Sequence, residues 1–221
     1  MKHLRERLNK FGHRNRMEKG EYNEEYFSRK IAGPPVSPRY MKSLIPTVFR
    51  NASFLLDAGC GTGECIDQIK ESGKDAVGID ISAFAVRKSG QILGSILHMP
   101  FKDNAFDGVT AFEVIEHLTY DEAICFLREC RRVLQRGGAL AVSTPNWLPR
   151  LWLWLRGITD LTHKSYFNVV SIKRTLKICG FDKVQTTSET ELKFRLHISV
   201  RGISPLAILG FGIIVMGKKM R

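Results

Sequence analysis

Three glycines at alternating positions follow an apolar strand, and this pattern constrains the fold more than any other part of the chain. They lie within Leu-Leu-Asp-Ala-Gly-Cys-Gly-Thr-Gly-Glu, residues 55–64, as Gly59, Gly61 and Gly63. The leucines suit a buried parallel strand, and glycine lets the backbone turn sharply where a Cβ atom would collide with a ligand. The pattern therefore predicts a nucleotide-binding cradle whose main-chain N–H groups meet the ligand, although a tight turn would also explain the glycines.

The residue after the third glycine argues against a dinucleotide. In the fingerprint G-x-G-x-x-G the third glycine would occupy position 64, where this chain has Glu64. A carboxylate there would repel a pyrophosphate, and Asp57 before the loop adds a second negative charge. A cofactor with a cationic end fits this loop better, which makes a nicotinamide-dependent dehydrogenase the weaker interpretation.

A second acid follows at the spacing of a ribose-binding carboxylate. Val77-Gly78-Ile79-Asp80 indicates a short strand that ends in an acid, and Asp80 lies 21 residues after Gly59. We therefore expect Asp80 to bind a ribose, with an ordinary turn carboxylate as the alternative.

Helices and strands alternate along the chain in the pattern of a parallel sheet covered on both faces, which predicts an α/β fold. Helices are expected at residues 40–49, after the glycine loop, after Ser82 and at 121–135, where Gly137-Gly138 supplies the stop. Later strands are expected at residues 139–143, 183–187 and 206–216.

Five motifs occur in a fixed order between residues 57 and 118: Asp-Ala-Gly-Cys-Gly-Thr-Gly, Gly-Ile-Asp, Met-Pro-Phe, Phe-Asp and Glu-His-Leu. Over about residues 50–145 this order resembles the class I S-adenosylmethionine-dependent methyltransferases, and most closely their small-molecule and ubiquinone-biosynthesis types. The resemblance implies S-adenosylmethionine as cofactor and a doubly wound, mostly parallel seven-stranded sheet with helices on both faces and an antiparallel last strand. It assigns residues 33–221 to the methyltransferase domain and leaves 1–32 as a basic N-terminal accessory segment.

The resemblance also implies cofactor contacts, residue by residue. Asp57 matches the acid near the methionine amino group, although capping of the following helix would also explain it. Ile81 would pack on the adenine ring. Phe112 would line the methionine end unless it is simply a core aromatic.

One position departs from the family pattern. The family often has an acid five residues before the proline of the Met-Pro-Phe motif, where it meets the adenine amino group, and this chain has Ser95. Serine can accept a hydrogen bond, and the backbone of Ile96 or the side chain of Met99 would do the rest. The expected cofactor-binding residues are Asp57, Gly59, Gly61, Gly63, Asp80, Ile81, Ser95, Ile96, Met99 and Phe112.

The string Glu113-Val-Ile-Glu116-His117 would place two carboxylates and an imidazole on one face of a helical turn, a geometry suited to a divalent cation. It resembles ubiquinone-biosynthesis O-methyltransferases and small-RNA 2′-O-methyltransferases, in which the matching residues and a later histidine hold a metal. His163 takes the place of that histidine. Because Glu-His-Leu also opens a helix in relatives without a metal, a metal at Glu113, Glu116, His117 and His163 is an option rather than the expected cofactor.

The expected reaction needs little acid–base chemistry from the protein. A sulfonium methyl group is already electrophilic, so holding an acceptor atom in line behind it supplies much of the acceleration. A base is needed only for an acceptor that keeps its proton. The sequence identifies no catalytic residue beyond two candidates for that base, His117 and His163, of which we favour His163.

All three tryptophans lie between Pro145 and Arg156. In the family, a segment at this point commonly forms a lid over the acceptor, so we expect a Trp-rich lid or insertion at about residues 146–160 and an acceptor with an apolar portion. Contact with a membrane surface and plain core or dimer packing are the alternatives.

Composition sets outer limits on the function. The five cysteines are odd in number and contain no C-x-x-C pair, which favours reduced thiols and a cytoplasmic protein, with surface association to a membrane as an option. The longest apolar run, residues 206–216, is too short to span a bilayer. The net charge of +12 lies in the flanks, since residues 1–50 and 151–221 are basic and 51–150 slightly acidic. Basic flanks would attract an anionic acceptor, RNA or an acidic membrane, or would serve only solubility.

The sequence thus predicts an S-adenosylmethionine-dependent methyltransferase that modifies a small or lipid-like acceptor at oxygen or a ring carbon. An RNA methyltransferase is the first alternative, weakened because no RNA-binding module is recognisable. A catalytically silent cofactor-binding or interaction protein is the second. The oligomeric state is left open.

Overall fold

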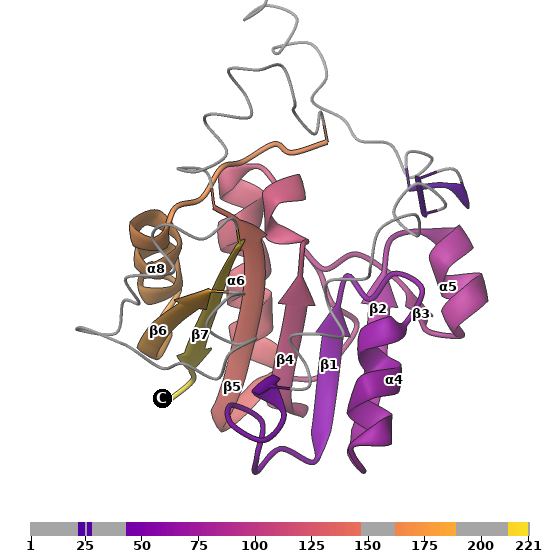
Figure 1. The fold of residues 1–221 in the computed structure, drawn as a ribbon, viewed down its shortest axis with the longest axis horizontal. Helices are drawn as coiled ribbons and strands as arrows, with labels where there is room; N and C mark the ends of the chain where they lie inside the picture. The colour runs from indigo at the N-terminus through magenta and orange to yellow at the C-terminus, as the bar shows by residue number, and fades with distance from the viewer. Residues whose placement is uncertain (1–21, 25, 28–42, 147–161, 189–211, 221) are drawn as a thin grey trace, which may run out of the picture.

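The computed structural model of the chain describes residues 22–24, 26–27, 43–146, 162–188 and 212–220 (Figure 1). The elements of the first half are β1 (Phe54–Ala58), α4 (Glu64–Glu71), β2 (Asp75–Asp80), α5 (Ala83–Ser89), β3 (Ile92–Leu93) and β4 (Phe106–Phe112). Those of the second half are the 3₁₀ turn η1 (Ile115–His117), α6 (Tyr120–Val133), β5 (Leu134–Pro145), α8 (Val169–Ile178), β6 (Asp182–Ser188) and β7 (Gly212–Lys218).

The strands form one seven-stranded sheet in the order β3-β2-β1-β4-β5-β7-β6. Strands β1 to β5 pair in parallel, whereas β7 runs antiparallel to both β5 and β6. The predicted mostly parallel sheet with an antiparallel last strand is therefore confirmed.

Helices cover both faces of this sheet, as a doubly wound fold requires. Successive residues of a strand point to opposite faces, so Leu56 joins a core cluster with residues of α6 and α8, and Leu55 joins a second cluster with residues of α4. Leu44 and Phe49 complete the second cluster. Figure 1 shows α4 and α6 on opposite sides of the central strands.

The expected helix at residues 40–49 is largely wrong. Within the described part, only residues 43 and 44 are helical, and residues 45–50 form turns. The amides of Thr47, Val48 and Phe49 all donate to the carbonyl of Leu44, at 3.3, 2.8 and 3.0 Å. Pro46 has no amide hydrogen to continue a helical ladder, so the chain closes into a tight turn that places Phe49 in the core.

The helix expected at residues 121–135 ends earlier than predicted, and the next strand starts sooner. Leu134 already has extended backbone angles and is the first residue of β5. The pairing with β4 shifts between Phe106↔Leu134 and Gly108↔Ala139, so Gly137-Gly138 lies within an irregular stretch of the strand. A Cβ atom at Gly138 would approach the Asp107 carbonyl oxygen at 3.0 Å, which explains a glycine there.

Several sequence expectations fall on residues outside the described ranges. These are the Trp-rich segment beyond Asn146, most of the N-terminal segment 1–32, and residues 206–211 of the last expected strand. All five cysteines lie within the described ranges and carry thiols rather than disulfides. Among the helices that the structure describes, none has both the length and the apolar character that crossing a bilayer requires.

Candidate functional site

The order in which the chain adds strands to the sheet reverses at strand β1. From β1 the chain moves outward to β2 and β3, then returns to pair β4 on the other side of β1. In open α/β sheets a ligand binds in the crevice at the carboxyl ends of the strands at such a switch point. Asp57, the glycine loop, Asp80 and Phe112 all lie at these carboxyl ends.

The glycine loop has the backbone angles that only glycine adopts without strain. Gly59, Gly61 and Gly63 have φ values of +79°, +51° and +97°. A Cβ atom at Gly59 would lie 2.5 Å from a methyl carbon of Val114. The loop therefore needs glycine both for its conformation and for its close packing against the segment after β4.

The loop amides do not all serve a ligand, which corrects part of the prediction. Gly59 and Cys60 donate to the carbonyl of Ile79 at 2.8 and 3.1 Å, and Gly61 donates to the Asp80 carboxylate at 2.8 Å. These bonds tie the loop to the end of β2. The loop thus presents a surface without side chains at Gly61, whereas the predicted array of N–H donors is largely used within the protein.

Asp80 holds a fixed position between the loop and α5. One of its carboxylate oxygens accepts from Gly61 N and the other from Ser82 N, both at 2.8 Å. Each carboxylate oxygen has more than one acceptor position, so a ribose hydroxyl can be bound at the same time. Ile81, with 39% of its surface exposed, follows directly and is available to a ligand.

Asp57 is a buried acid next to the crevice. Its side chain is 3% exposed and accepts a 2.7 Å hydrogen bond from the Thr110 hydroxyl on β4. Burial raises the pKa of Asp57 to about 7, although hydrogen bonds from Thr110 and Cys65 oppose the rise. The N-cap of α4 is Gly63 and receives no side-chain cap, so the interpretation of Asp57 as a helix cap is wrong. A cationic group brought beside Asp57 would favour its ionised form.

The residues expected around an adenine ring follow β3 in a turn. Ser95 Oγ accepts from Leu97 N at 3.2 Å, and Ile96 is half-buried. Met99 is 5% exposed and belongs to the core cluster beneath α6, and Phe112 is 7% exposed and belongs to the cluster on the other face. Both side chains thus have a packing role, and their contact with a cofactor stays a prediction.

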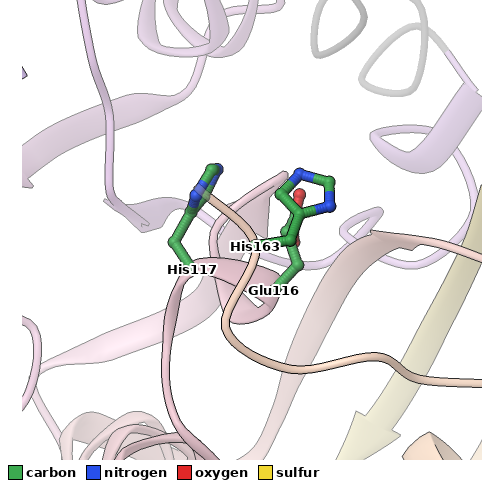
Figure 2. Close-up of side chains that lie close together, drawn as sticks. All are labelled: Glu116, His117 and His163. Carbon is green, nitrogen blue, oxygen red and sulfur yellow. The ribbon is translucent and has the colours of Figure 1, made fainter. Parts of the chain in front are cut away.

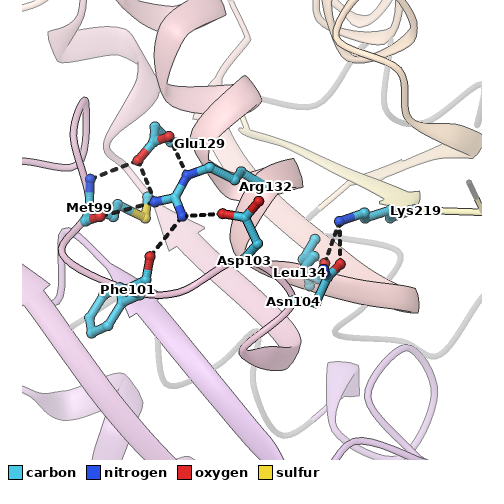
Figure 3. A network of polar contacts seen from close by, with 8 residues as sticks. All are labelled: Met99, Phe101, Asp103, Asn104, Glu129, Arg132, Leu134 and Lys219. Atoms are coloured by element: carbon cyan, nitrogen blue, oxygen red, sulfur yellow. Dashed lines mark hydrogen bonds and ion pairs between the residues drawn. The ribbon is translucent and has the colours of Figure 1, made fainter.

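Two residues of α6 that sequence patterns did not single out hold this turn in place (Figure 3). Glu129 accepts from Met99 N at 2.8 Å, and Arg132 donates to the carbonyls of Met99 and Phe101 at 3.0 and 2.7 Å. Arg132 also pairs with Glu129 and Asp103, and its hydrogen bond lowers the pKa of Glu129. On an amphipathic helix such residues resemble any exposed charged pair, so no sequence pattern indicates this role.

Beyond the carboxyl end of β4, Glu116, His117 and His163 converge (Figure 2). Their ligand atoms all lie within 4.8 Å of one another, and Glu116 is 2% exposed. The amides of Lys164 and Ser165 donate to the Glu116 carbonyl at 2.8 and 3.1 Å, which brings His163 to the turn η1. The imidazoles of His117 and His163 meet edge to face, with centroids 5.1 Å apart.

Glu113 is not part of this group, so the expectation of one helical face is wrong. Its φ of +55° interrupts any helix, and η1 begins only at Ile115. The Glu113 carboxylate instead accepts from Ser143 Oγ on β5 at 2.8 Å. Three of the four candidate metal ligands therefore come together among the described residues.

A hydrogen bond between the His117 ring and a backbone carbonyl suits a role as metal ligand. Its Nδ1 atom lies 3.3 Å from the carbonyl of Thr162. With the proton on Nδ1, this nitrogen donates to that carbonyl and Nε2 keeps its lone pair. A backbone carbonyl that fixes the tautomer in this way is the usual support of a metal-binding histidine.

Comparisons with known proteins agree with the methyltransferase resemblance of the sequence motifs. A family model described as a methyltransferase domain matches residues 56–142. The chain is 33% identical over 141 residues to a protein of Mycolicibacterium smegmatis described as a probable S-adenosylmethionine-dependent methyltransferase, covering 60% of this chain and 53% of that protein. It is 29% identical over 111 residues to the ubiquinone biosynthesis O-methyltransferase of Sodalis glossinidius, covering 45% of this chain and 44% of that protein. The chain thus spans about half the length of these curated relatives.

A solved structure shares the fold over most of its length. The S-adenosylmethionine-dependent methyltransferase from Archaeoglobus fulgidus aligns with a TM-score of 0.66 at 21% identity, covering 89% of this chain and all of that one. The similarity extends the fold assignment beyond the five sequence motifs.

Proposed function

We infer, from the premise that residues 56–142 form a class I S-adenosylmethionine-dependent methyltransferase domain, that the protein moves a methyl group from S-adenosylmethionine to a small or lipid-like acceptor. The observation that carries this proposal is the pair of acids at the ends of β1 and β2, one on each side of a loop whose glycines have positive φ. Asp80 would bind the ribose hydroxyls and Asp57 the methionine ammonium group, and bound S-adenosylmethionine supplies an activated methyl group.

The residues on the acceptor side support methylation at oxygen. His117 and His163 lie together at η1, where either imidazole can take the proton of a hydroxyl acceptor. A relative named for O-methylation in ubiquinone biosynthesis is consistent with a lipid-like acceptor. A ring carbon as the methylated atom is the alternative, and RNA as acceptor is favoured only by the basic flanks.

The proposal is tested by binding and transfer together. Calorimetry is expected to show one equivalent of S-adenosylhomocysteine bound by the wild-type chain. Tritiated S-adenosylmethionine is expected to label small organic-soluble acceptors from a cell extract rather than RNA from the same extract. If the chain bound no S-adenosylhomocysteine, the proposal would be wrong. Binding without methyl transfer to any fraction of the extract would favour a catalytically silent cofactor-binding protein. Label in RNA, with binding that weakens steeply in salt, would favour the RNA alternative.

The cluster of Glu116, His117 and His163 supports a second proposal, a divalent metal beside the acceptor. Two imidazoles and one carboxylate form a ligand set for Zn²⁺ or Mn²⁺, and a metal would lower the pKa of an acceptor hydroxyl. A carboxylate buried to the extent of Glu116 is more stable beside a positive charge. This goes further than the sequence analysis, in which a metal at these residues was an option rather than the expected cofactor.

His163→Ala is expected to lower the affinity for Zn²⁺ or Mn²⁺ at least tenfold, because it removes one of three ligands from the cluster. Elemental analysis and calorimetric titration of the purified chain measure this. His98→Ala is the matched control, since His98 is exposed and lies outside the cluster. Equal uptake by the wild type and His163→Ala, or no uptake by the wild type, would contradict a metal site here.

A further inference from the structure

Three aromatic side chains ahead of the methyltransferase domain form a compact group, which we call the aromatic turn: Tyr22, Tyr26 and Phe27. Tyr22 meets Tyr26 edge to face at 5.0 Å between centroids, and Tyr26 meets Phe27 in the same way at 5.2 Å. Asn23 stabilises the turn, because its side chain accepts from Tyr26 N at 3.1 Å and its carbonyl accepts from Phe27 N at 3.3 Å. These residues belong to the segment for which the sequence predicted only an accessory role.

One side of the aromatic turn lies against the cofactor-binding elements. Ser82 Oγ donates to the carbonyl of Tyr22 at 2.6 Å, while the amide of the same serine donates to Asp80. The ring of Phe27 stacks on Phe84 of α5 with centroids 6.0 Å apart. The aromatic turn is thus attached to Ser82, two residues after the expected ribose ligand Asp80.

Phe27 also covers the glycine loop. A Cβ atom built on Gly61 would lie 3.3 Å from Cε1 of Phe27. The bare surface of the loop at Gly61 therefore faces an aromatic ring. The ring therefore lies against the glycine whose amide donates to Asp80.

The other side of the aromatic turn reaches the acceptor side. The ring of Tyr22 meets the His117 imidazole edge to face, with centroids 6.1 Å apart. Tyr22 therefore contacts Ser82, just after β2, through its carbonyl and His117 of η1, which follows β4, through its ring. Strands β2 and β4 lie on opposite sides of β1. Figure 1 shows the short described indigo segment beyond the carboxyl ends of the strands, next to α5.

We propose that Tyr22 and Phe27 form an aromatic cap that retains S-adenosylmethionine in its site and must move for the cofactor to leave. This rests on the proposed function, since it assigns the cofactor to the crevice between Asp57 and Asp80. Phe27 closes the crevice over the glycine loop, and Tyr22 spans it toward the acceptor side. An apolar ring that covers a bound ligand slows dissociation more than association, because its contacts are lost when the ligand leaves.

The test is the dissociation rate of S-adenosylhomocysteine from the full chain, measured by displacement of tritiated ligand. The ligand is expected to dissociate about tenfold faster from Phe27→Ala and from Tyr22→Ala than from the wild type. Phe27→Leu keeps an apolar side chain, so its dissociation rate is expected to increase less than that of Phe27→Ala. Phe54→Ala is the matched control: Phe54 is a 39% exposed phenylalanine at the first residue of β1, away from the carboxyl ends. Its rate is expected to equal that of the wild type.

A second measurement does not depend on any variant. Hydrogen exchange at the amides of Tyr26 and Phe27 in the wild type is expected to slow when S-adenosylhomocysteine is bound, because cap opening exposes these amides. Wild-type dissociation rates in both alanine variants, or ligand-independent exchange at these amides, would overturn the cap. A wild type that binds no S-adenosylhomocysteine would instead overturn the proposed function, so the two failures are distinguishable.

Discussion

Replacing Asp80 with alanine is expected to weaken the binding of S-adenosylhomocysteine about 10- to 100-fold, the effect of removing a charged hydrogen bond to a ribose hydroxyl. The substitution also removes the acceptors of Gly61 N and Ser82 N, which hold the loop and the start of α5 in place. Asp80→Asn is expected to recover only part of the loss, because one amide oxygen cannot reproduce both bonds. Isothermal titration calorimetry measures the affinities.

Asp75→Ala provides the matched control for Asp80→Ala. Asp75 is the first residue of β2, is exposed, and lies at the opposite end of the same strand. Its replacement is expected to leave the affinity unchanged. An Asp80→Ala variant that binds as tightly as the wild type would contradict the assignment of this carboxylate to the cofactor.

The affinity for S-adenosylhomocysteine is expected to increase with pH, by up to tenfold per pH unit below neutrality, and to level off above neutrality. In the ligand-free protein the pKa of Asp57 is raised to about 7, chiefly by burial, so the carboxyl group is largely protonated below that pH. The ionised form is needed to bind the ligand's ammonium group, so binding at low pH must release a proton. Calorimetry between pH 5.5 and 8, in buffers of different ionisation enthalpy, measures both the affinity and the protons released.

Two variants test whether Asp57 causes this dependence. Asp57→Asn is expected to bind more weakly and without the pH dependence. Thr110→Val removes the hydroxyl that donates to Asp57, and because this bond lowers the pKa, the midpoint is expected to move to higher pH. A flat affinity for the wild type across this range would contradict the assigned role.

The same raised pKa has a consequence for stability without ligand. A carboxyl group whose folded pKa exceeds its unfolded value of 3.8 favours the folded state while it is protonated. The contribution of Asp57 is therefore fully present below about pH 4 and is lost as the pH rises toward 7. A bound ammonium group would offset this loss, which links cofactor binding to stability at neutral pH.

Sequence patterns predicted the core of the fold because its signals are local. The adjacent Leu55 and Leu56 indicated a strand buried on both faces, as β1 is. The order of motifs predicted a methyltransferase domain that uses S-adenosylmethionine, in agreement with the domain match over residues 56–142 and with a relative described as S-adenosylmethionine-dependent. The glycine loop was placed correctly because its positive φ angles admit little else. These features depend on residues close together in the chain.

The error at Glu113 arises because a distant residue decides the local structure. The spacing of Glu113 and Glu116 suggested one helical face, but a hydrogen bond from Ser143 on β5 holds Glu113 apart with a positive φ. The aromatic turn could not be predicted either. Three aromatic residues do not reveal a partner by their spacing, and their contacts are with Ser82, Phe84 and His117, far away in the chain.

The attachment of His163 to η1 bears on how this site can diverge among related sequences. The link between the two segments uses the main-chain amides of Lys164 and Ser165, and the lysine takes part in it through its amide rather than its side chain. Evolution can therefore replace that lysine with almost any residue and keep the histidine where it is. Proline, which has no amide hydrogen, is the exception, because it would remove the shorter of the two main-chain bonds to Glu116.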